Sequence, residues 1–156
     1  MKFYTKISLI LCSCLAGCHF SPLYGEHTIN GVCVLPIPEA SGAAIYRQLK
    51  QHFPDTGPCQ YTLKVSPPQT ILADQGISDK DFITMQQVRS VVSYTLLGSD
   101  KQTVLQNQLT TTGSSSIVAN PYATVVATEK TEANINTILA EQIALHVAAF
   151  LDRTQK

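Results

Sequence analysis

Residues 86–118 read QQVRSVVSYTLLGSDKQTVLQNQLTTTGSSSIV, and this stretch decides the fold. Apolar and polar residues alternate over 86–97, which is the period of a half-buried strand. The residues predicted to share its buried side are Val88, Val92, Tyr94 and Leu96. Gly98–Lys101 has the composition of a hairpin turn. Residues 103–118 are therefore predicted to return as an antiparallel strand, with a break or bulge at Gly113.

Upstream of this hairpin the sequence predicts a strand, a helix and a second strand. Residues 29–37 are rich in valine and are stopped by prolines, as in a strand. A helix is expected from an N-cap at Ser41 to about residue 53, because apolar residues recur there every four positions. Residues 60–65 alternate as a half-buried strand. The charged stretch 69–84 is expected to be an exposed connection.

A long helix is predicted at the C-terminal end. Pro121 opens it, and no proline or glycine occurs from about Thr124 to Arg153. Its predicted apolar face consists of Ile135, Ile138, Leu139, Ile143 and Phe150. The expected order is therefore β-α-β-β-β-α. This order predicts an α/β (α+β) fold, a small mixed four-stranded sheet with two helices packed on one face.

The N-terminal residues resemble a secretory signal. Lys2 and Lys6 precede an apolar run over residues 7–16, which is too short to span a bilayer core of about 30 Å. The run ends in a lipobox, Leu15-Ala16-Gly17-Cys18, whose Cys18 thiol would accept a diacylglycerol. The alternatives are a plain secretory signal with a chance cysteine, or a buried helix. The predicted organisation is a signal peptide over 1–17, a lipidated tether over 18–28 and a single α/β domain over 29–156.

The remaining cysteines and the net charge restrict the redox compartment and the class of partner that we expect for the domain. Cys12 and Cys14 leave with the signal peptide and Cys18 is acylated, so two cysteines remain, Cys33 and Cys59. They would form a disulfide in an oxidising compartment or remain as two buried thiols. Nine basic and eleven acidic residues also remain, so the mature net charge is −2 (9 minus 11). The chain has no basic run, which argues against nucleic acid as a partner.

No catalytic set is evident in the sequence. It lacks the nucleophile, zinc and phosphate-loop motifs, and its four histidines lie far apart. We therefore expect no enzyme activity, no cofactor and no metal. His146, on the predicted last helix, is expected to be a packed or partner-facing residue.

The residues Cys18-His19-Phe20-Ser21-Pro22-Leu23-Tyr24-Gly25 resemble the mature start of the LPS-assembly lipoprotein LptE family, alphaproteobacterial type. That family typically opens with Cys-x-Phe-x-Pro-Leu-Tyr-Gly, and His19 replaces its commoner glycine. The C-terminal stretch also resembles the family's last helix, in the Tyr122-Ala123 start and the Leu139-Ala140-Glu141-Gln142-Ile143 core. His19 is also compatible with the outer membrane, because aspartate at this position favours inner-membrane retention.

The resemblance implies a lipid-anchored outer-membrane protein that occupies the lumen of an LptD-type barrel and its periplasmic side. Such proteins form a plug, help the barrel to assemble and contact lipopolysaccharide on its way to the cell surface. Their fold is a small α/β sandwich. The alternative is a generic periplasm-facing outer-membrane lipoprotein scaffold of the same fold class.

Two sets of residues are candidates for contacts. Basic residues could pair with lipid A phosphates; these are Arg89 first, then Lys64, Lys101 and Lys130, each of which could equally be solvated surface charge. The Ser/Thr tract 110–116 could meet the polar inner wall of a barrel, or be only an exposed strand end.

Overall fold

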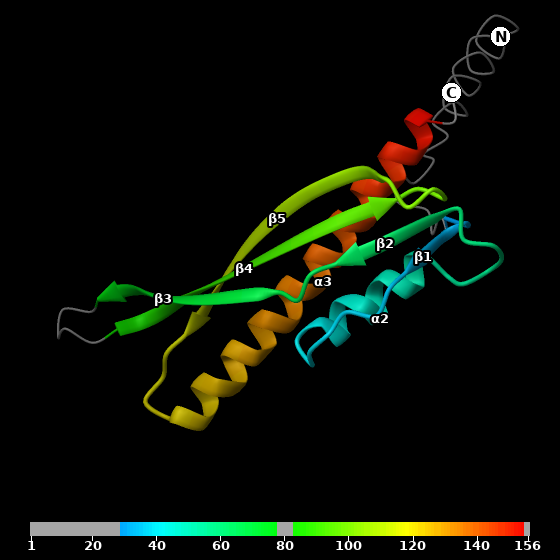
Figure 1. The fold of residues 1–156 in the computed structure, drawn as a ribbon. Helices are drawn as coiled ribbons and strands as arrows, with labels where there is room; N and C mark the ends of the chain where they lie inside the picture. The colour runs from blue at the N-terminus through cyan, green and yellow to red at the C-terminus, as the bar shows by residue number, and fades with distance from the viewer. Residues whose placement is uncertain (1–28, 78–82, 155–156) are drawn as a thin grey trace, which may run out of the picture.

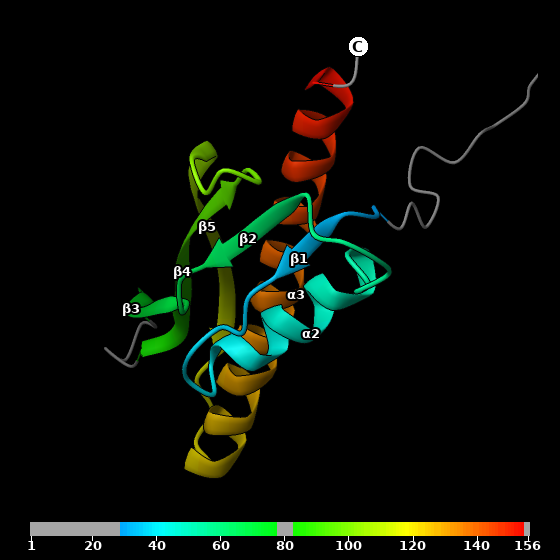
Figure 2. The same cartoon turned by 45° about the vertical axis from the view of Figure 1, so that its right-hand side comes forward.

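The computed structural model describes residues 29–77 and 83–154. The elements are β1 (Val32–Val34), α2 (Gly42–His52), β2 (Tyr61–Val65), β3 (Gln69–Ile77), β4 (Ile83–Leu97), β5 (Thr103–Ser116) and α3 (Pro121–Thr154). Both helices pack on one face of a mixed sheet, as Figures 1 and 2 show, and the α+β class is confirmed. The described sheet has five strands rather than the expected four. The predicted signal peptide and tether, with Cys18, lie outside the described residues.

β4 organises the sheet. Along one edge it pairs antiparallel with β5 over almost its whole length. Its other edge is shared, because β2 pairs with Tyr94–Leu97 and β3 pairs with Ile83–Val91. The short β1 lies parallel to β2, with Val32 opposite Tyr61. In Figure 1 β2 and β3 accordingly follow one another along the same side of β4.

The stretch 69–84 was wrongly predicted to be a connection, because residues 69–77 form β3. The prediction failed because this strand has no side buried by a helix in the described part of the chain. Neither α2 nor α3 contacts β3 within the described ranges, so neither helix covers a face of residues 69–74. The side chains of residues 69–74 are all exposed, Ile71 and Leu72 included. A strand without a buried face leaves no alternation in the sequence to detect.

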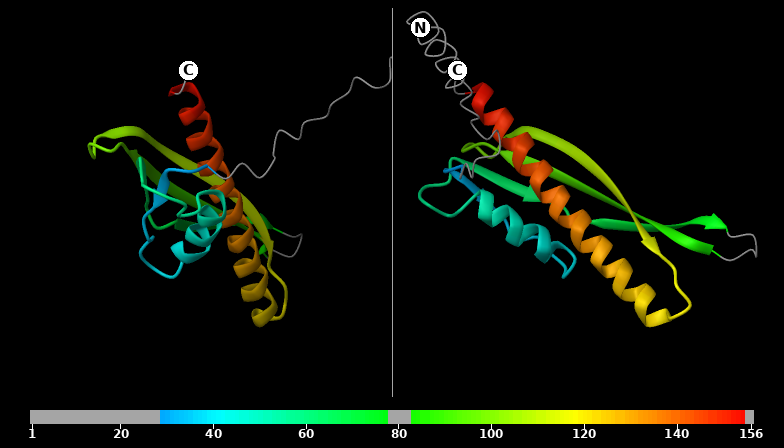
Figure 3. Two further views of the ribbon diagram at one scale, coloured as in Figure 1. Left: turned by 90° about the vertical axis from the view of Figure 1, so that its right-hand side faces the viewer. Right: turned by 180° about the vertical axis from the view of Figure 1, so that it is seen from behind.

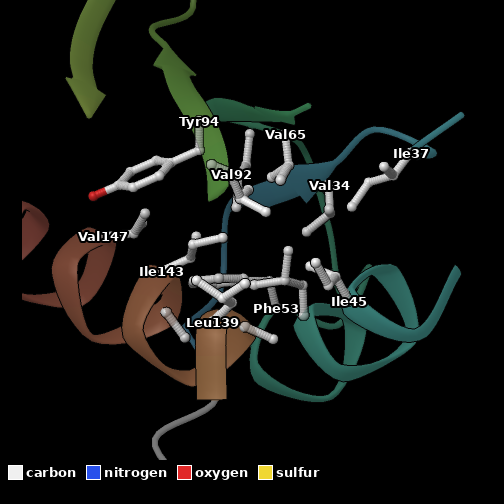
Figure 4. Packing of buried hydrophobic residues seen from close by; sticks show 14 of the residues in the cluster. Val34, Ile37, Ile45, Phe53, Val65, Val92, Tyr94, Leu139, Ile143 and Val147 are labelled. Atoms are coloured by element: carbon white, nitrogen blue, oxygen red, sulfur yellow. The ribbon is translucent and has the colours of Figure 1, made fainter. Parts of the chain in front are cut away.

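The core lies between the sheet and the two helices (Figure 4). On α2 and just after it, Ile45, Leu49 and Phe53 have no exposed surface, as their four-residue spacing predicts. The buried stripe of α3 is Ile135, Leu139, Ile143, Val147 and Leu151. Ile138 was wrongly assigned to this stripe: it is 42% exposed, because the helix buries the side of the stripe that carries Ala140 and Ala144, and Ile138 lies on the other side. The four residues predicted on the buried side of β4 are all buried.

Glycine at position 113 allows α3 to lie close to the sheet. β5 continues through Gly113 in regular register with Val88, so the predicted break is wrong, and the irregularity lies at Leu96/Leu97 instead. A Cβ at Gly113 would come 2.8 Å from Thr131 Cγ2 and 3.2 Å from Ile135 Cδ1. No larger side chain fits there without displacing α3, which runs diagonally beneath β5 in Figure 3.

The β4–β5 turn forms where the sequence predicts it. The Lys101 N–H donates to the Gly98 carbonyl at 3.0 Å, and the Gln102 N–H donates to Asp100 Oδ1 at 3.1 Å. Lys101 adopts a φ of 62° to close the turn. Ser41 stands at the N-cap of α2 as expected, but its side chain makes no capping hydrogen bond. Within residues 29–77 and 83–154, neither helix has the length and hydropathy needed to cross a membrane.

Candidate interaction surfaces

The sheet face opposite the helices, here called the open face, is not covered by any helix in the described ranges. Buried Val88, Val92 and Leu96 point toward the helices, so the alternate residues of β4 point away from them. The described residues of the open face are Thr62, Lys64, Gln69, Ile71, Ala73, Met85, Gln87, Arg89, Val91, Ser93, Thr95, Gln106, Gln108, Thr110, Thr112, Ser114 and Ser116. This face is mainly hydroxyl and amide groups, with Lys64 and Arg89 as its charged residues.

The four candidate basic residues do not form one cluster. Lys64 is exposed on the open face beside Thr95, and Arg89 is exposed there beside Thr112. Thr95 and Arg89 are six residues apart on β4, so the two cations are roughly 20 Å apart along the strand. Lys101 lies in the turn at one end of the sheet, and Lys130 is exposed on α3, on the helix side. Only Lys64 and Arg89 therefore share a face.

Strand alternation divides the Ser/Thr tract. Thr110, Thr112, Ser114 and Ser116 belong to the open face, whereas Thr111, Gly113 and Ser115 point toward α3. Ser115 is 3% exposed, and its Oγ lies 3.3 Å from Thr128 Oγ1 on α3. The interpretation of the whole tract as one outer surface was therefore wrong for three of its seven residues.

Two hydroxyls on the helix side of the sheet are buried without a hydrogen-bond partner in the described residues. Thr111 and Ser90 are register partners on β5 and β4. Thr111 Oγ1 and Ser90 Oγ are both buried, and neither has a hydrogen-bond partner within the described residues. A buried hydroxyl without a partner lowers stability, because it has lost its hydrogen bonds to water.

Thr111→Val is expected to raise the free energy of unfolding by about 1 kcal/mol, because valine has the shape of threonine without the unpartnered hydroxyl. Urea unfolding of the purified domain measures this. Thr110→Val is the matched control, since Thr110 is exposed on the open face and should change stability little. Thr111→Arg should instead destabilise the domain, because it places a charge against α3. Equal changes in stability for Thr110→Val and Thr111→Val would contradict the assignment of Thr110 to the open face and Thr111 to the helix side.

The two remaining cysteines are joined. Cys33 on β1 and Cys59, just before β2, form a disulfide with their Cα atoms 5.5 Å apart. The parallel β1–β2 pair, in which Cys33 lies opposite Thr62, brings them together. Lys50 on α2 also forms an ion pair with Asp55 in the loop that leads to Cys59. The disulfide therefore ties the three-residue strand β1 to the rest of the sheet.

His146 contacts the one tyrosine of the buried core. Tyr94 Oη lies 3.0 Å from His146 Nδ1, and Tyr94 itself is 1% exposed. Burial raises the pKa of the Tyr94 hydroxyl, and a hydrogen bond with Asn107 opposes this shift. Tyr94 therefore remains protonated at neutral pH, and the Tyr94–His146 pair links β4 to α3.

No catalytic or metal-binding arrangement stands out in the part of the chain that the structure describes. There, no three histidine, cysteine or acidic side chains gather as metal ligands. A shallow depression lies between the start of β2 and the β4–β5 turn, lined by Gln60, Tyr61, Gly98, Ser99, Asp100 and Val104. Its lining has one carboxylate and no basic partner for it. The expectation that the chain is not an enzyme remains a prediction.

Several solved structures share this fold, and three of them are lipoproteins that illustrate the similarity. Rare lipoprotein B from Shewanella oneidensis matches with a TM-score of 0.65 and 8% identity, covering 81% of this chain and 98% of that one. Lipoprotein B from Nitrosomonas europaea gives 0.60 and 12%, covering 81% and 88%. A minor lipoprotein from Acinetobacter baumannii gives 0.59 and 16%, covering 76% and 93%. No family model matches the chain, and no curated protein matches it in sequence. At these identities the similarity shows the fold.

Proposed function

We propose that this protein is an outer-membrane lipoprotein of the lipopolysaccharide transport and assembly machinery. It would form a plug in an LptD-type barrel, assist assembly of that barrel and help to deliver lipopolysaccharide to the cell surface. The observation that carries the proposal is the octapeptide Cys18–Gly25, which begins at the cysteine of the lipobox. The fold supports it, because the solved structures with a similar fold include the three lipoproteins described above.

The open face supports a position inside a barrel. The lumen of an outer-membrane barrel is polar, so a plug must present polar groups to the wall. Hydroxyl and amide side chains can pair with such a wall at a lower desolvation cost than charges. Four of the seven residues of the Ser/Thr tract meet this requirement, because they are exposed on the open face.

Lipopolysaccharide contact is proposed first at Arg89. Its guanidinium can bind a phosphate through two parallel hydrogen bonds, and its side chain is exposed on the open face. Lys64 would be a second contact farther along the same face. Lys101 and Lys130 do not lie beside them, so they would contact different groups of the lipopolysaccharide.

The test is copurification from detergent-solubilised membranes. Tagged protein is expected to bring down one outer-membrane barrel in a one-to-one complex. Ser93→Arg should reduce the yield at least severalfold, because it introduces a bulky charge in the middle of the open face.

The matched control is Asn134→Arg, which places the same side chain on an exposed position of α3. It should copurify like the wild type. If no barrel is recovered with folded protein, the proposal fails and the generic periplasm-facing scaffold replaces it.

A further inference from the structure

β5 has an unpaired edge along its whole length. In the described part of the sheet, β5 pairs with β4 and with no other strand. A strand paired on one side directs alternate backbone N–H and C=O groups outward. These groups form a row of donors and acceptors at the spacing that another extended chain would match.

The hydrogen bonds of Ser93 identify the outward residues. The Ser66 N–H donates to the Ser93 carbonyl at 2.8 Å, and the Ser93 N–H donates to Ser66 Oγ at 2.9 Å. The backbone of Ser93 therefore faces away from β5, and its register partner Gln108 directs its own backbone outward. By alternation the outward set is Gln106, Gln108, Thr110, Thr112, Ser114 and Ser116, all of them exposed. The Gln108 N–H is bonded to Asn107 Oδ1 at 2.8 Å.

This edge lacks the features that normally prevent pairing with another chain. Exposed edges are usually protected by charged residues, prolines or bulges. β5 has no charged residue and no proline, and its register is regular from Leu105 to Ser116. The free edge of β3 differs, because it carries Asp74 and follows Pro67-Pro68. The difference points to β5 as the edge that receives a partner.

We propose that the β5 edge is completed by an extended segment of the barrel partner, which adds to the sheet as a further antiparallel or parallel strand. This rests on the proposed function. A closed barrel wall has no free strand edge, so the segment comes from a loop or another part of that protein outside the wall. The segment is extended, uncharged and on the order of ten residues long, to match residues 106–116.

The occupant is a segment of the barrel protein rather than a second copy, because the edge and the open face form one continuous surface. The six outward residues of β5 also belong to the open face. A strand added at this edge extends the same uncharged polar surface that is proposed to meet the lumen. Backbone pairing supplies affinity there without charges, and none are present on β5.

Thr110→Pro tests the edge. Proline removes the outward N–H of residue 110, which takes no part in the β4–β5 ladder, and proline is tolerated at such positions. The yield of copurified barrel is expected to fall at least tenfold. Thr110→Ala loses the same hydroxyl but keeps the N–H, so its yield should stay at least fivefold above that of Thr110→Pro. Thermal unfolding of both variants checks that the fold is retained.

Amide hydrogen exchange of the wild-type protein, alone and in the copurified complex, gives a readout that does not depend on the proline. Exchange at the outward amides of residues 106, 110, 112, 114 and 116 should slow at least tenfold in the complex. If the complex forms with these amides unprotected, or binds Thr110→Pro as well as Thr110→Ala, the edge inference is overturned and the proposed function stands. Concentration-dependent protection in the isolated protein would assign the edge to a second copy and overturn it too. Failure of every variant to bring down a barrel overturns both proposals.

Discussion

Replacing Cys33 and Cys59 together with serine is expected to lower the free energy of unfolding by about 3.5 kcal/mol. The disulfide closes a 26-residue segment, and the chain-entropy model gives this value for a loop of that size. A domain of this size is typically stable by about 5–15 kcal/mol, so the loss is a substantial fraction. The midpoint of thermal unfolding should fall by roughly 10–15 °C.

The control for this prediction is chemical reduction of the disulfide in the wild type. Dithiothreitol should destabilise the wild type by a similar amount and leave the double serine variant unchanged. The loss should be concentrated at β1, because its partners are β2, the disulfide and a small contact with α2. A double variant as stable as the oxidised wild type would show that the disulfide adds nothing to stability.

Cys18→Ser is expected to abolish membrane anchoring. A serine hydroxyl does not replace the thiol that receives the lipid, so the product should remain an unprocessed precursor or be soluble. Two or more acyl chains give stable anchoring, whereas a single chain gives marginal binding. Membrane fractionation in cells depleted of the proposed barrel partner measures this, because binding to that partner would otherwise retain the protein at the membrane.

Cys14→Ser is the matched control, since Cys14 lies within the predicted signal peptide. It should be processed and anchored like the wild type. Wild-type levels of Cys18→Ser in the outer membrane of the depleted cells would refute the lipoprotein interpretation.

The sequence predicted most of the fold because most of its elements have one buried side. The alternation of β4 and the four-residue spacing of Ile45, Leu49 and Phe53 both follow from the burial of one side of the element. β3 was missed because no helix covers it, so its composition resembles that of a loop. Ile138 was misplaced because the buried stripe of α3 is narrower than its apolar content suggests.

The candidate surfaces were less predictable. The sequence placed Lys64 and Arg89 on the side away from the core, which is correct, but could not show that they lie roughly 20 Å apart. The composition of the Ser/Thr tract did not show that its residues alternate between two faces of the sheet. That division follows only from the register of β5 with β4. Sequence alternation within that tract was absent, because small hydroxyl residues occupy both sides. The unpaired edge of β5 required the strand order.

The central position of β4 has a consequence for the order in which the chain can fold. β2, β3 and β5 all pair with residues 83–97, yet synthesis from the N-terminus delivers β1, α2 and β2 first. Until β4 emerges, β1 and β2 have only one another, and a two-stranded unit is marginal in water. The apolar side of α2 is then without its cover from α3. The sheet is therefore expected to form only when residues 83–116 are available, because the β4–β5 hairpin supplies the pairing that the preceding strands need.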